Sequence, residues 1–197
     1  MSRLPYLRRD DLDEQGRAVW DGLTASRGSS LVNEEGGLAG PFNAWVTAPE
    51  AGGRLADLGG HLRFGTSLER RLLELAIVTV GAHWQAEFEW WAHAPMARRH
   101  GVADSILDAL AEGRTPSFAA DDERAVHAVA SQLARSGRVD NGAYAAARAL
   151  VGDAGMVELV SLCGYYTMVS FTLNAFAVPL PPGADPVWPP DPTSSGS

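Results

Sequence analysis

Residues 74–93 read ELAIVTVGAHWQAEFEWWAH, and this stretch indicates both the fold and a candidate site. On a helix, Glu89 and His93 lie one turn apart on the same face. Glu74 belongs to the preceding apolar helical segment, where a carboxylate without a partner is costly to bury. Two carboxylates and one imidazole between apolar helices can transfer protons. We therefore predict that Glu74, Glu89 and His93 form a catalytic site.

Aromatic residues close to this pair support the prediction: Trp84, Phe88, Trp90 and Trp91. Enclosure by aromatic rings removes water, which raises the pKa of a carboxylate and lowers that of a histidine towards neutrality, where general acids and bases work best. We expect Trp84, Trp90 and Trp91 to wall a substrate pocket. The alternative is structural: Glu89 and His93 form an ordinary ion pair on a solvated helix face, and Glu74 pairs with Arg63 or Arg71.

Further candidate substrate-binding residues lie on neighbouring segments. His61 and Arg63 end a predicted helix and could form an anion-binding rim, although a solvated helix end also explains His61. Tyr165 and Asn174 bring polar groups into the last apolar helix, as a ligand pocket requires. Buried hydroxyls that bond to the backbone are the alternative explanation.

Composition excludes several classes of function. The chain has 197 residues, a net charge of −8 and a pI near 5.0, which argue against nucleic acid or anionic membrane as the main partner. All 16 basic residues are arginine. Without lysine, Schiff-base chemistry, pyridoxal-phosphate attachment and P-loop phosphate binding are excluded. A single cysteine, Cys163, rules out an intramolecular disulfide and a CxxC redox pair.

The localisation signals are mostly negative. The N-terminal residues MSRLPYLRRDDLDE lack the apolar run of a signal peptide. Residues 156–180 are apolar enough to raise the question of a membrane span. Glu158, Ser161 and Asn174 interrupt that stretch and favour a buried core helix. We therefore expect a cytoplasmic protein.

The pattern predicts an all-α fold, a compact helical bundle, with no useful strand pattern. Residues 1–180 are expected to form one domain, and the Pro-rich residues 181–197 a flexible C-terminal tail. The Gly- and Ser-rich residues 25–42 predict a loop, and a loop of this length is often functional. The expected helices cover residues 10–24, 43–64 with a break at Pro49, 67–80, 85–100 closed by Gly101, 104–111, 121–135, 141–150 and 155–177.

A metal site is an alternative use of the same three side chains. Glu74, Glu89 and His93 could ligate iron, manganese or zinc and make the protein an oxygenase or hydrolase. A ferritin-like di-iron site requires two Glu-x-x-His steps, whereas this chain has one Glu-to-His step with four-residue spacing. A mononuclear site remains open. Our leading reading needs no cofactor and no metal.

Two motifs resemble the carboxymuconolactone decarboxylase family, which also contains the alkylhydroperoxidase proteins. They are LERRLLEL at residues 68–75 and EFEWWAH at residues 87–93, followed by Pro95, Ala97 and Gly101. The similarity extends over about residues 41–178 and includes LNAF at residues 173–176. The resemblance implies an alkylhydroperoxidase-like, all-helical subunit that forms homo-oligomers, with trimers or hexamers favoured and dimers possible, and with the site near a subunit interface.

The resemblance also separates two branches of chemistry. The peroxidase branch uses a glutamate, a CxxC pair and a histidine; Glu74 and His93 match the first and last, but Ala86 and Glu89 occupy the cysteine positions. Thiol-dependent peroxide reduction is therefore excluded. The decarboxylase branch resembles a Glu-x-Glu-x-x-x-His pattern, matched by Glu87, Glu89 and His93.

Our leading hypothesis is a cofactor-independent lyase, a decarboxylase or a related proton-transfer enzyme. Its substrate would be a small cyclic or aromatic carboxylate, lactone or polyketide-like compound. We assign His93 as proton donor, Glu89 as the group that orients it or takes a proton, and Glu74 as a second base. The alternatives are the metal-dependent enzyme and a non-catalytic helical oligomer that binds a small molecule.

Overall fold

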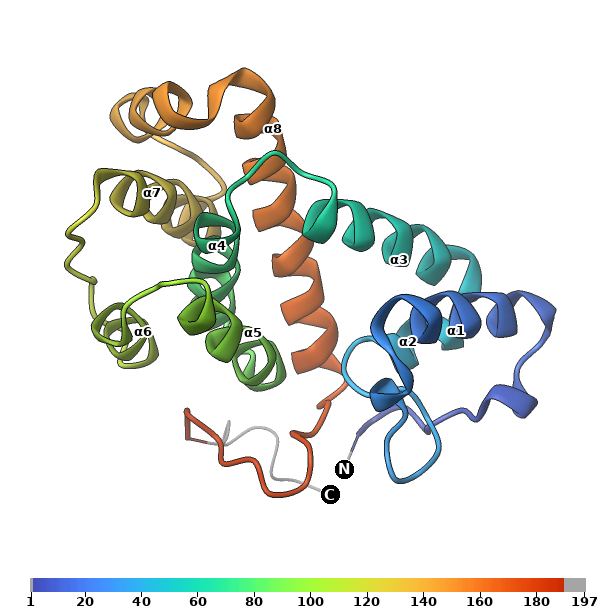
Figure 1. The fold of residues 1–197 in the computed structure, drawn as a ribbon. Coiled ribbons are helices and arrows are strands. Elements are labelled where there is room, and N and C mark those ends of the chain that lie inside the picture. Colours follow the sequence, from blue (N-terminus) through green and yellow to red (C-terminus); the bar gives the residue numbers. More distant parts are fainter. Residues whose placement is uncertain (1, 190–197) are drawn as a thin grey trace.

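The computed structural model describes residues 2–189, leaving out the side chain of Ser29, and the secondary-structure elements of these residues are helices joined by loops. Their β pairing is limited to an isolated antiparallel bridge between Val32 and Leu38. The all-α prediction is therefore confirmed (Figure 1). The α-helices are α1 (Glu14–Arg27), α2 (Phe42–Thr47), α3 (Pro49–Phe64), α4 (Arg70–His83), α5 (Glu87–Arg99), α6 (Asp104–Ala111), α7 (Asp121–Ser136) and α8 (Asn141–Ala175), with short 3-10 turns at Arg9–Asp11 and Ser29–Leu31.

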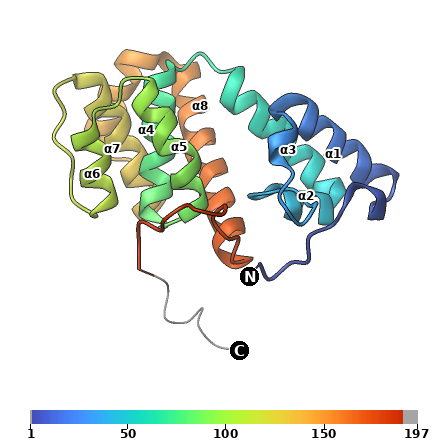
Figure 2. The same ribbon diagram turned by 60° about the horizontal axis from the view of Figure 1, so that its bottom comes forward.

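The helices form two groups. α1, α2 and α3 pack together on one side, and α4 to α7 on the other, with the second half of α8 between them (Figures 1 and 2). The main hydrophobic core includes Leu73 and Ile77 of α4 and Leu159 and Leu162 of α8. Contacts of α8 with both α3 and α5 join the two groups.

α4 is the central helix of the second group, because it packs against α5, α6, α7 and α8. Every residue from Leu72 to Gly81 is buried, and Glu74 is among them. The prediction that Ser67 begins this helix is wrong, since α4 begins at Arg70. The backbone N–H and hydroxyl of Ser67 instead donate to a carboxylate oxygen of Glu158 at 2.9 and 2.7 Å, which ties the loop before α4 to α8.

α8 is the longest helix and bends sharply at Gly152, whose φ of 69° and ψ of −177° are not helical. The bend separates the two helical segments that the sequence predicted. α8 is long and apolar enough to cross a membrane by length and composition, but half of its most apolar window is buried inside the protein. The fully buried Leu159 and Leu162 belong to the main core, so the second half of α8 is a core helix of this domain.

The turn between α4 and α5 lies where a break was predicted. α4 ends at His83, and Gln85 adopts a left-handed conformation with φ of 47° before α5 begins at Glu87. The turn makes α5 run back along α4. It thereby brings the two halves of the predicted site together.

The C-terminal segment is packed against the domain, contrary to the flexible tail that we expected. The backbone N–H groups of Val187 and Trp188 donate to the carboxylate of Glu87 at 3.0 and 2.6 Å. The indole of Trp188 is buried against Trp90, and its Nε1–H donates to the carbonyl of Ala111 at 2.8 Å. The expected tail is therefore anchored to the domain at Val187 and Trp188, whereas residues 190–197 lie outside the described part.

Candidate active site

His93 lies between two carboxylates inside the protein. Its Nδ1 is 2.7 Å from Oε2 of Glu74, and its Nε2 is 3.1 Å from Oε1 of Glu89. The exposed fractions are 0% for Glu74, 4% for Glu89 and 5% for His93. These distances and this burial confirm that the three residues come together, and they rule out the solvated ion pair that we considered for Glu89 and His93.

Three helices position the group. The apolar faces of α4 bury Glu74, and α5 places Glu89 and His93 one turn apart on the side that faces α4. Tyr166 of α8 presents its ring edge-on to the imidazole, with the ring centroids 5.2 Å apart. The imidazole is therefore held by a hydrogen bond at Nδ1, faces a carboxyl oxygen of Glu89 at Nε2, and is packed along one side of its ring.

The two carboxylates have opposite pKa shifts. Burial raises the pKa of Glu74, but the hydrogen bond and the positive charge of His93, together with the charges of Arg63 and Arg70, outweigh it, so that the pKa is lowered. Arg70 reaches Oε1 of Glu74 at 3.6 Å. For Glu89 burial dominates and raises the pKa. Glu74 is thus stabilised as a carboxylate and Glu89 as a carboxylic acid.

The directions of these shifts and the distances favour one arrangement of the protons. An ionised Glu74 accepts the N–H of Nδ1, which fixes the orientation and tautomer of the ring. Nε2 then faces Glu89, and a proton on Glu89 can be shared between its carboxyl oxygen and Nε2. Burial also raises the pKa of Tyr166 well above its ordinary value, so its hydroxyl stays protonated. The arrangement can donate or accept one proton at the end of a Glu74–His93–Glu89 chain.

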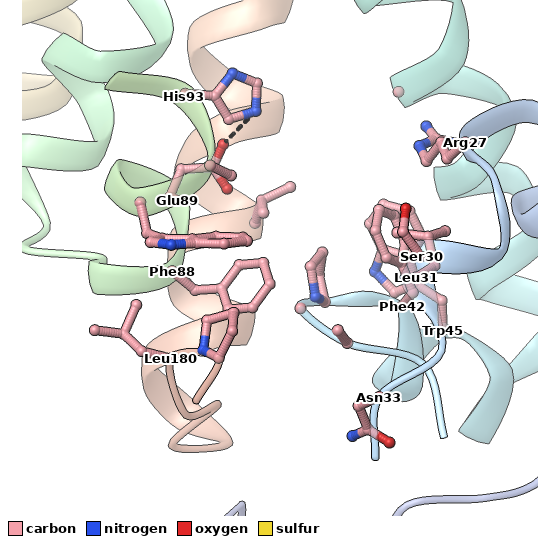
Figure 3. A pocket seen from close by; sticks show the side chains of 18 of the residues that line it. Arg27, Ser30, Leu31, Asn33, Phe42, Trp45, Phe88, Glu89, His93 and Leu180 are labelled. Carbon is pink, nitrogen blue, oxygen red and sulfur yellow. Dashed lines mark ion pairs between the residues drawn. The ribbon is translucent and has the colours of Figure 1, made fainter. Parts of the chain in front are cut away.

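A cavity of about 1030 Å³ opens beside Glu89 and His93, between the two groups of helices (Figure 3). Glu89 and His93 line one wall, and the labelled Arg27, Phe42 and Trp45 lie on the opposite wall. Most of the lining is apolar or aromatic. The aromatic side chains of the lining are Tyr6, Phe42, Trp45, Phe64, Phe88, Trp91, Tyr165 and Tyr166.

The cavity contains part of the predicted substrate-binding set. Arg63, Trp91 and Tyr165 line it together with Glu89 and His93. The hydroxyl of Tyr165 donates to the backbone carbonyl of Leu55 at 3.1 Å, as the structural alternative for this residue proposed.

The other predicted substrate-binding residues lie elsewhere. Trp90 is buried against Trp188 in a second apolar cluster, because it points away from the face of α5 that carries His93. Trp84 packs against Phe171. Asn174 donates to the backbone carbonyl of Trp84 at 2.8 Å and so closes the turn after α4.

His61 is exposed on the far side of α3, where it borders a separate shallow pocket with α1. A pairing of His61 with Arg63 in one anion-binding rim is therefore wrong. Glu74 also does not line the main cavity, because His93 stands between it and the open space. Our assignment of Glu74 as a second base that acts on substrate needs correction.

Glu87 does not join the group either, although the resemblance placed it in the motif. It lies two positions before Glu89 and therefore points away from that residue's face of α5. Its carboxylate holds the C-terminal segment through Val187 and Trp188. Among residues 2–189, Glu87 forms no ion pair with an arginine of α5, and Arg98 pairs with Asp104.

Sequence reasoning missed much of the opposite wall. Arg27 ends α1, Phe42 and Trp45 belong to α2, and the loop that joins the two helices contributes Ser30 and Leu31 to the same wall. The Gly- and Ser-rich composition of residues 25–42 marked a loop of functional length, but it did not indicate that the loop faces His93. Gly40, with φ of 63°, belongs to this lining, and a Cβ there would lie 2.8 Å from the ring of Phe88.

The geometry does not suit the metal-ligand hypothesis. Both imidazole nitrogens of His93 already face carboxylate oxygens, so Glu74, Glu89 and His93 point at one another rather than at a common centre. Across residues 2–189, no group of three or more His, Cys, Asp or Glu side chains has an arrangement that could hold a metal ion. The three-ligand alternative is therefore not supported by this donor set.

Comparisons with known proteins identify the fold. No model of a protein family and no curated protein sequence matches the chain. Among solved structures, an alkylhydroperoxidase AhpD core protein from Ralstonia eutropha JMP134, described as an uncharacterized peroxidase-related protein, is 15% identical with a TM-score of 0.72 and covers 92% of this chain and 93% of its own. An uncharacterized peroxidase-related protein from Silicibacter sp. TM1040 is 15% identical with a TM-score of 0.70, covering 92% of each chain.

A third structure is a protein of unknown function from Agrobacterium tumefaciens, whose description suggests that it is the antioxidant defence protein AhpD. It is 17% identical with a TM-score of 0.63 and covers 72% of this chain and 98% of its own.

The lone Cys163 of the present chain is buried, and burial raises its thiol pKa to about 12, so it lacks the character of a peroxidatic thiol. The chain has the all-helical AhpD-like fold that the resemblance implied, and at identities of 15–17% the likeness extends to the fold.

Proposed function

We propose that this protein is a cofactor-independent lyase that removes CO2 from a small cyclic or aromatic carboxylate, lactone or polyketide-like compound. The observation that carries the proposal is the buried Glu74–His93–Glu89 chain at the wall of a cavity of about 1030 Å³. The cavity is large enough for a compound of this class and is mainly apolar.

The reaction requires a proton and no external electron source. When the carbon–carbon bond to the carboxylate breaks, its electron pair moves into a conjugated carbonyl or lactone of the substrate, and CO2 leaves. The resulting enolate then takes a proton at carbon. An acid with a pKa near the working pH supplies this proton best, and burial moves Glu89 in that direction.

The roles of the three residues follow from their positions. Glu89 and His93 line the cavity, so they are the residues that exchange protons with the substrate. Glu74 lies behind His93 and is a positioning residue that holds the imidazole through Nδ1. After CO2 has left and the carbon is protonated, a proton from solvent restores Glu89 or His93.

The test is turnover of a panel of cyclic and aromatic β-keto acids and lactone carboxylates in D2O, with CO2 release and deuterium incorporation at carbon as readouts. His93→Gln is expected to lower kcat by about 10²–10⁴-fold, because it removes the proton-transfer chain. His83→Gln is the matched control, since His83 is exposed at the end of α4 and does not line the cavity.

A folded His93→Gln protein that turns over at the wild-type rate contradicts the assignment. If no compound of the panel is consumed but some of them raise the melting temperature, the results favour the alternative of a non-catalytic protein that binds a small molecule.

A further inference from the structure

Among residues 2–189, three arginines line the cavity without an ion pair, and two of them, Arg27 and Arg63, are partly buried, whereas Arg99 is exposed. Arg27 ends α1 and Arg63 lies in the last turn of α3, and both contribute to the lining. Within residues 2–189, neither guanidinium forms an ion pair, and the Nε of each is buried without a hydrogen-bond partner. Buried guanidinium groups normally have anionic or hydrogen-bonding partners, because an unpaired buried charge is costly.

Their contacts leave the positive charges uncompensated. The guanidinium of Arg27 lies over the ring of Phe42 at 5.2 Å, and that of Arg63 over the ring of Phe64 at 5.3 Å. A nitrogen of Arg63 also contacts Sδ of Met96 at 2.8 Å, and Nη1 of Arg27 donates to the neutral hydroxyl of Ser26 at 3.0 Å. Burial lowers the pKa of Arg27, and the nearby charge of Arg63 lowers it further. The two cations therefore share one region of the cavity.

Among residues 2–189, the acidic groups around the cavity form no ion pair with Arg27 or Arg63. Glu34 and Glu35 are exposed in the loop at its rim. Glu89 faces His93, and burial favours its neutral form. Glu74 lies outside the lining and is bonded to His93. The inner part of the cavity thus combines an aromatic surface with two guanidinium groups that have no ion-pair partner in the described part of the chain.

We propose that Arg27 and Arg63 bind the acidic group of an aromatic ligand and so select acids over neutral analogues. Two guanidinium groups can hold one carboxylate through charge-assisted hydrogen bonds. The ring system would pack on Phe42, Trp45 and Phe88 of the same cavity. Arg27 lies on the wall opposite Glu89 and His93, so the acidic group held there is distinct from the carboxylate that leaves as CO2, and the rest of the ligand extends towards the proton-transfer group (Figure 3).

This inference deepens the proposed function by assigning the residues that recognise the substrate class. The probes are 2-naphthoate and its neutral counterpart 2-naphthamide, whose binding to the full chain is measured by isothermal titration calorimetry. Wild type is expected to bind the acid more tightly than the amide. Arg27→Gln and Arg63→Gln should each weaken naphthoate binding by about 10- to 100-fold, the usual effect of a lost hydrogen bond to a charged group, and leave naphthamide binding unchanged.

Arg54→Gln is the matched control, because Arg54 is an arginine of α3 that does not line this cavity. Arg27→Lys keeps the charge without the planar fork and should give an intermediate loss, so the proposal can still be tested if Arg27→Gln does not fold. Equal affinities of wild type for acid and amide, or unchanged naphthoate binding in the Arg27 and Arg63 variants, would overturn it.

Naphthoate binding and substrate turnover, both measured for the His93, Arg27 and Arg63 variants, separate this proposal from the proposed function. If the protein binds aromatic acids without decarboxylating any of them, naphthoate binding remains sensitive to Arg27 and Arg63 and the anion site stands. If the lyase proposal is right and the anion site is wrong, turnover depends on His93 whereas the Arg27 and Arg63 variants bind and react as wild type does.

Discussion

The two walls of the cavity are built in different ways. On the wall formed by α4, α5 and α8, the polar side chains contact one another: His93 lies between Glu74 and Glu89, and Tyr166 packs against the imidazole. On the wall formed by α1, α2 and α3, Arg27 and Arg63 have no charged partner among the described residues. The first wall is therefore organised before any ligand arrives, whereas the second has charges that a ligand can satisfy.

This difference follows from packing. α4 contacts four other helices and is buried from Leu72 to Gly81, so a charged group there must find its partner within the protein. The helices α1 to α3 meet the rest of the domain mainly through the contact of α3 with α8. A group that performs proton transfer gains from the rigid wall, and groups that recognise a substrate can occupy the other.

Removal of Glu74 should have the largest effect and tests the wall formed by α4, α5 and α8, whose polar side chains contact one another. Glu74→Ala should reduce the free energy of unfolding at neutral pH by about 3–5 kcal/mol, because it leaves His93 and Arg70 without their buried partner. Urea denaturation followed by circular dichroism measures the change. Glu69→Ala is the control: this exposed residue pairs with Arg71 at the surface, and its loss should cost about 0–1 kcal/mol. Equal effects of the two substitutions would show that Glu74 is not part of a coupled buried group.

The junction between the walls can be tested at adjacent glycines of α3. A Cβ at Gly59 would lie 2.0 Å from Oη of Tyr165, whose hydroxyl bonds to Leu55 where α3 crosses α8. Gly59→Ala should therefore destabilise the protein by about 1–3 kcal/mol, because the helices must separate or Tyr165 must move. No heavy atom lies within 4 Å of a Cβ at Gly60, and Gly60→Ala should stabilise the helix by about 0.5–1 kcal/mol. Thermal unfolding of both variants decides the question, and a stable Gly59→Ala protein would contradict the tight crossing.

The smallest effect concerns the pH dependence of stability around His93. The pKa of Glu89 is raised in the folded protein. Its contribution to the free energy of unfolding is therefore full below the pKa of about 4.3 in the unfolded chain, and it is lost as the pH rises through the folded pKa. Glu89→Gln should therefore gain stability relative to wild type as the pH rises, by about 1.4 kcal/mol for each unit of pKa difference.

For Glu74→Gln, the change in stability relative to wild type should vary with pH in the opposite direction, and this variant serves as the comparison. The folded pKa of Glu74 is lowered, so its contribution is present above about 4.3 and disappears as pH falls through the folded pKa. The loss of stability in Glu74→Gln should shrink on acidification. Urea midpoints at a series of pH values measure both trends, and trends of the same sign in the two variants would contradict the assigned protonation states.

The sequence predicted the wall of the cavity whose residues are local to one another. Glu89 and His93 are four positions apart on one helix, and the turn after α4 returns α5 along it, so short-range periodicity was enough to bring Glu74, Glu89 and His93 together. The tryptophans show the limit of this reasoning. Trp90 and Trp91 are adjacent, yet Trp91 lines the cavity and Trp90 packs against Trp188, a contact that no local pattern indicates.

The sequence by itself determined the helical fold, the exclusion of lysine and thiol-pair chemistry, and the candidate group around His93, because these depend on composition and on spacing within a helix or between neighbouring helices. Only the tertiary structure decided which carboxylate faces the cavity, that Glu87 holds the C-terminal segment, and that Arg27 lies across from His93. These features join residues far apart in the chain, and their positions depend on how the helices pack rather than on any repeat within one helix.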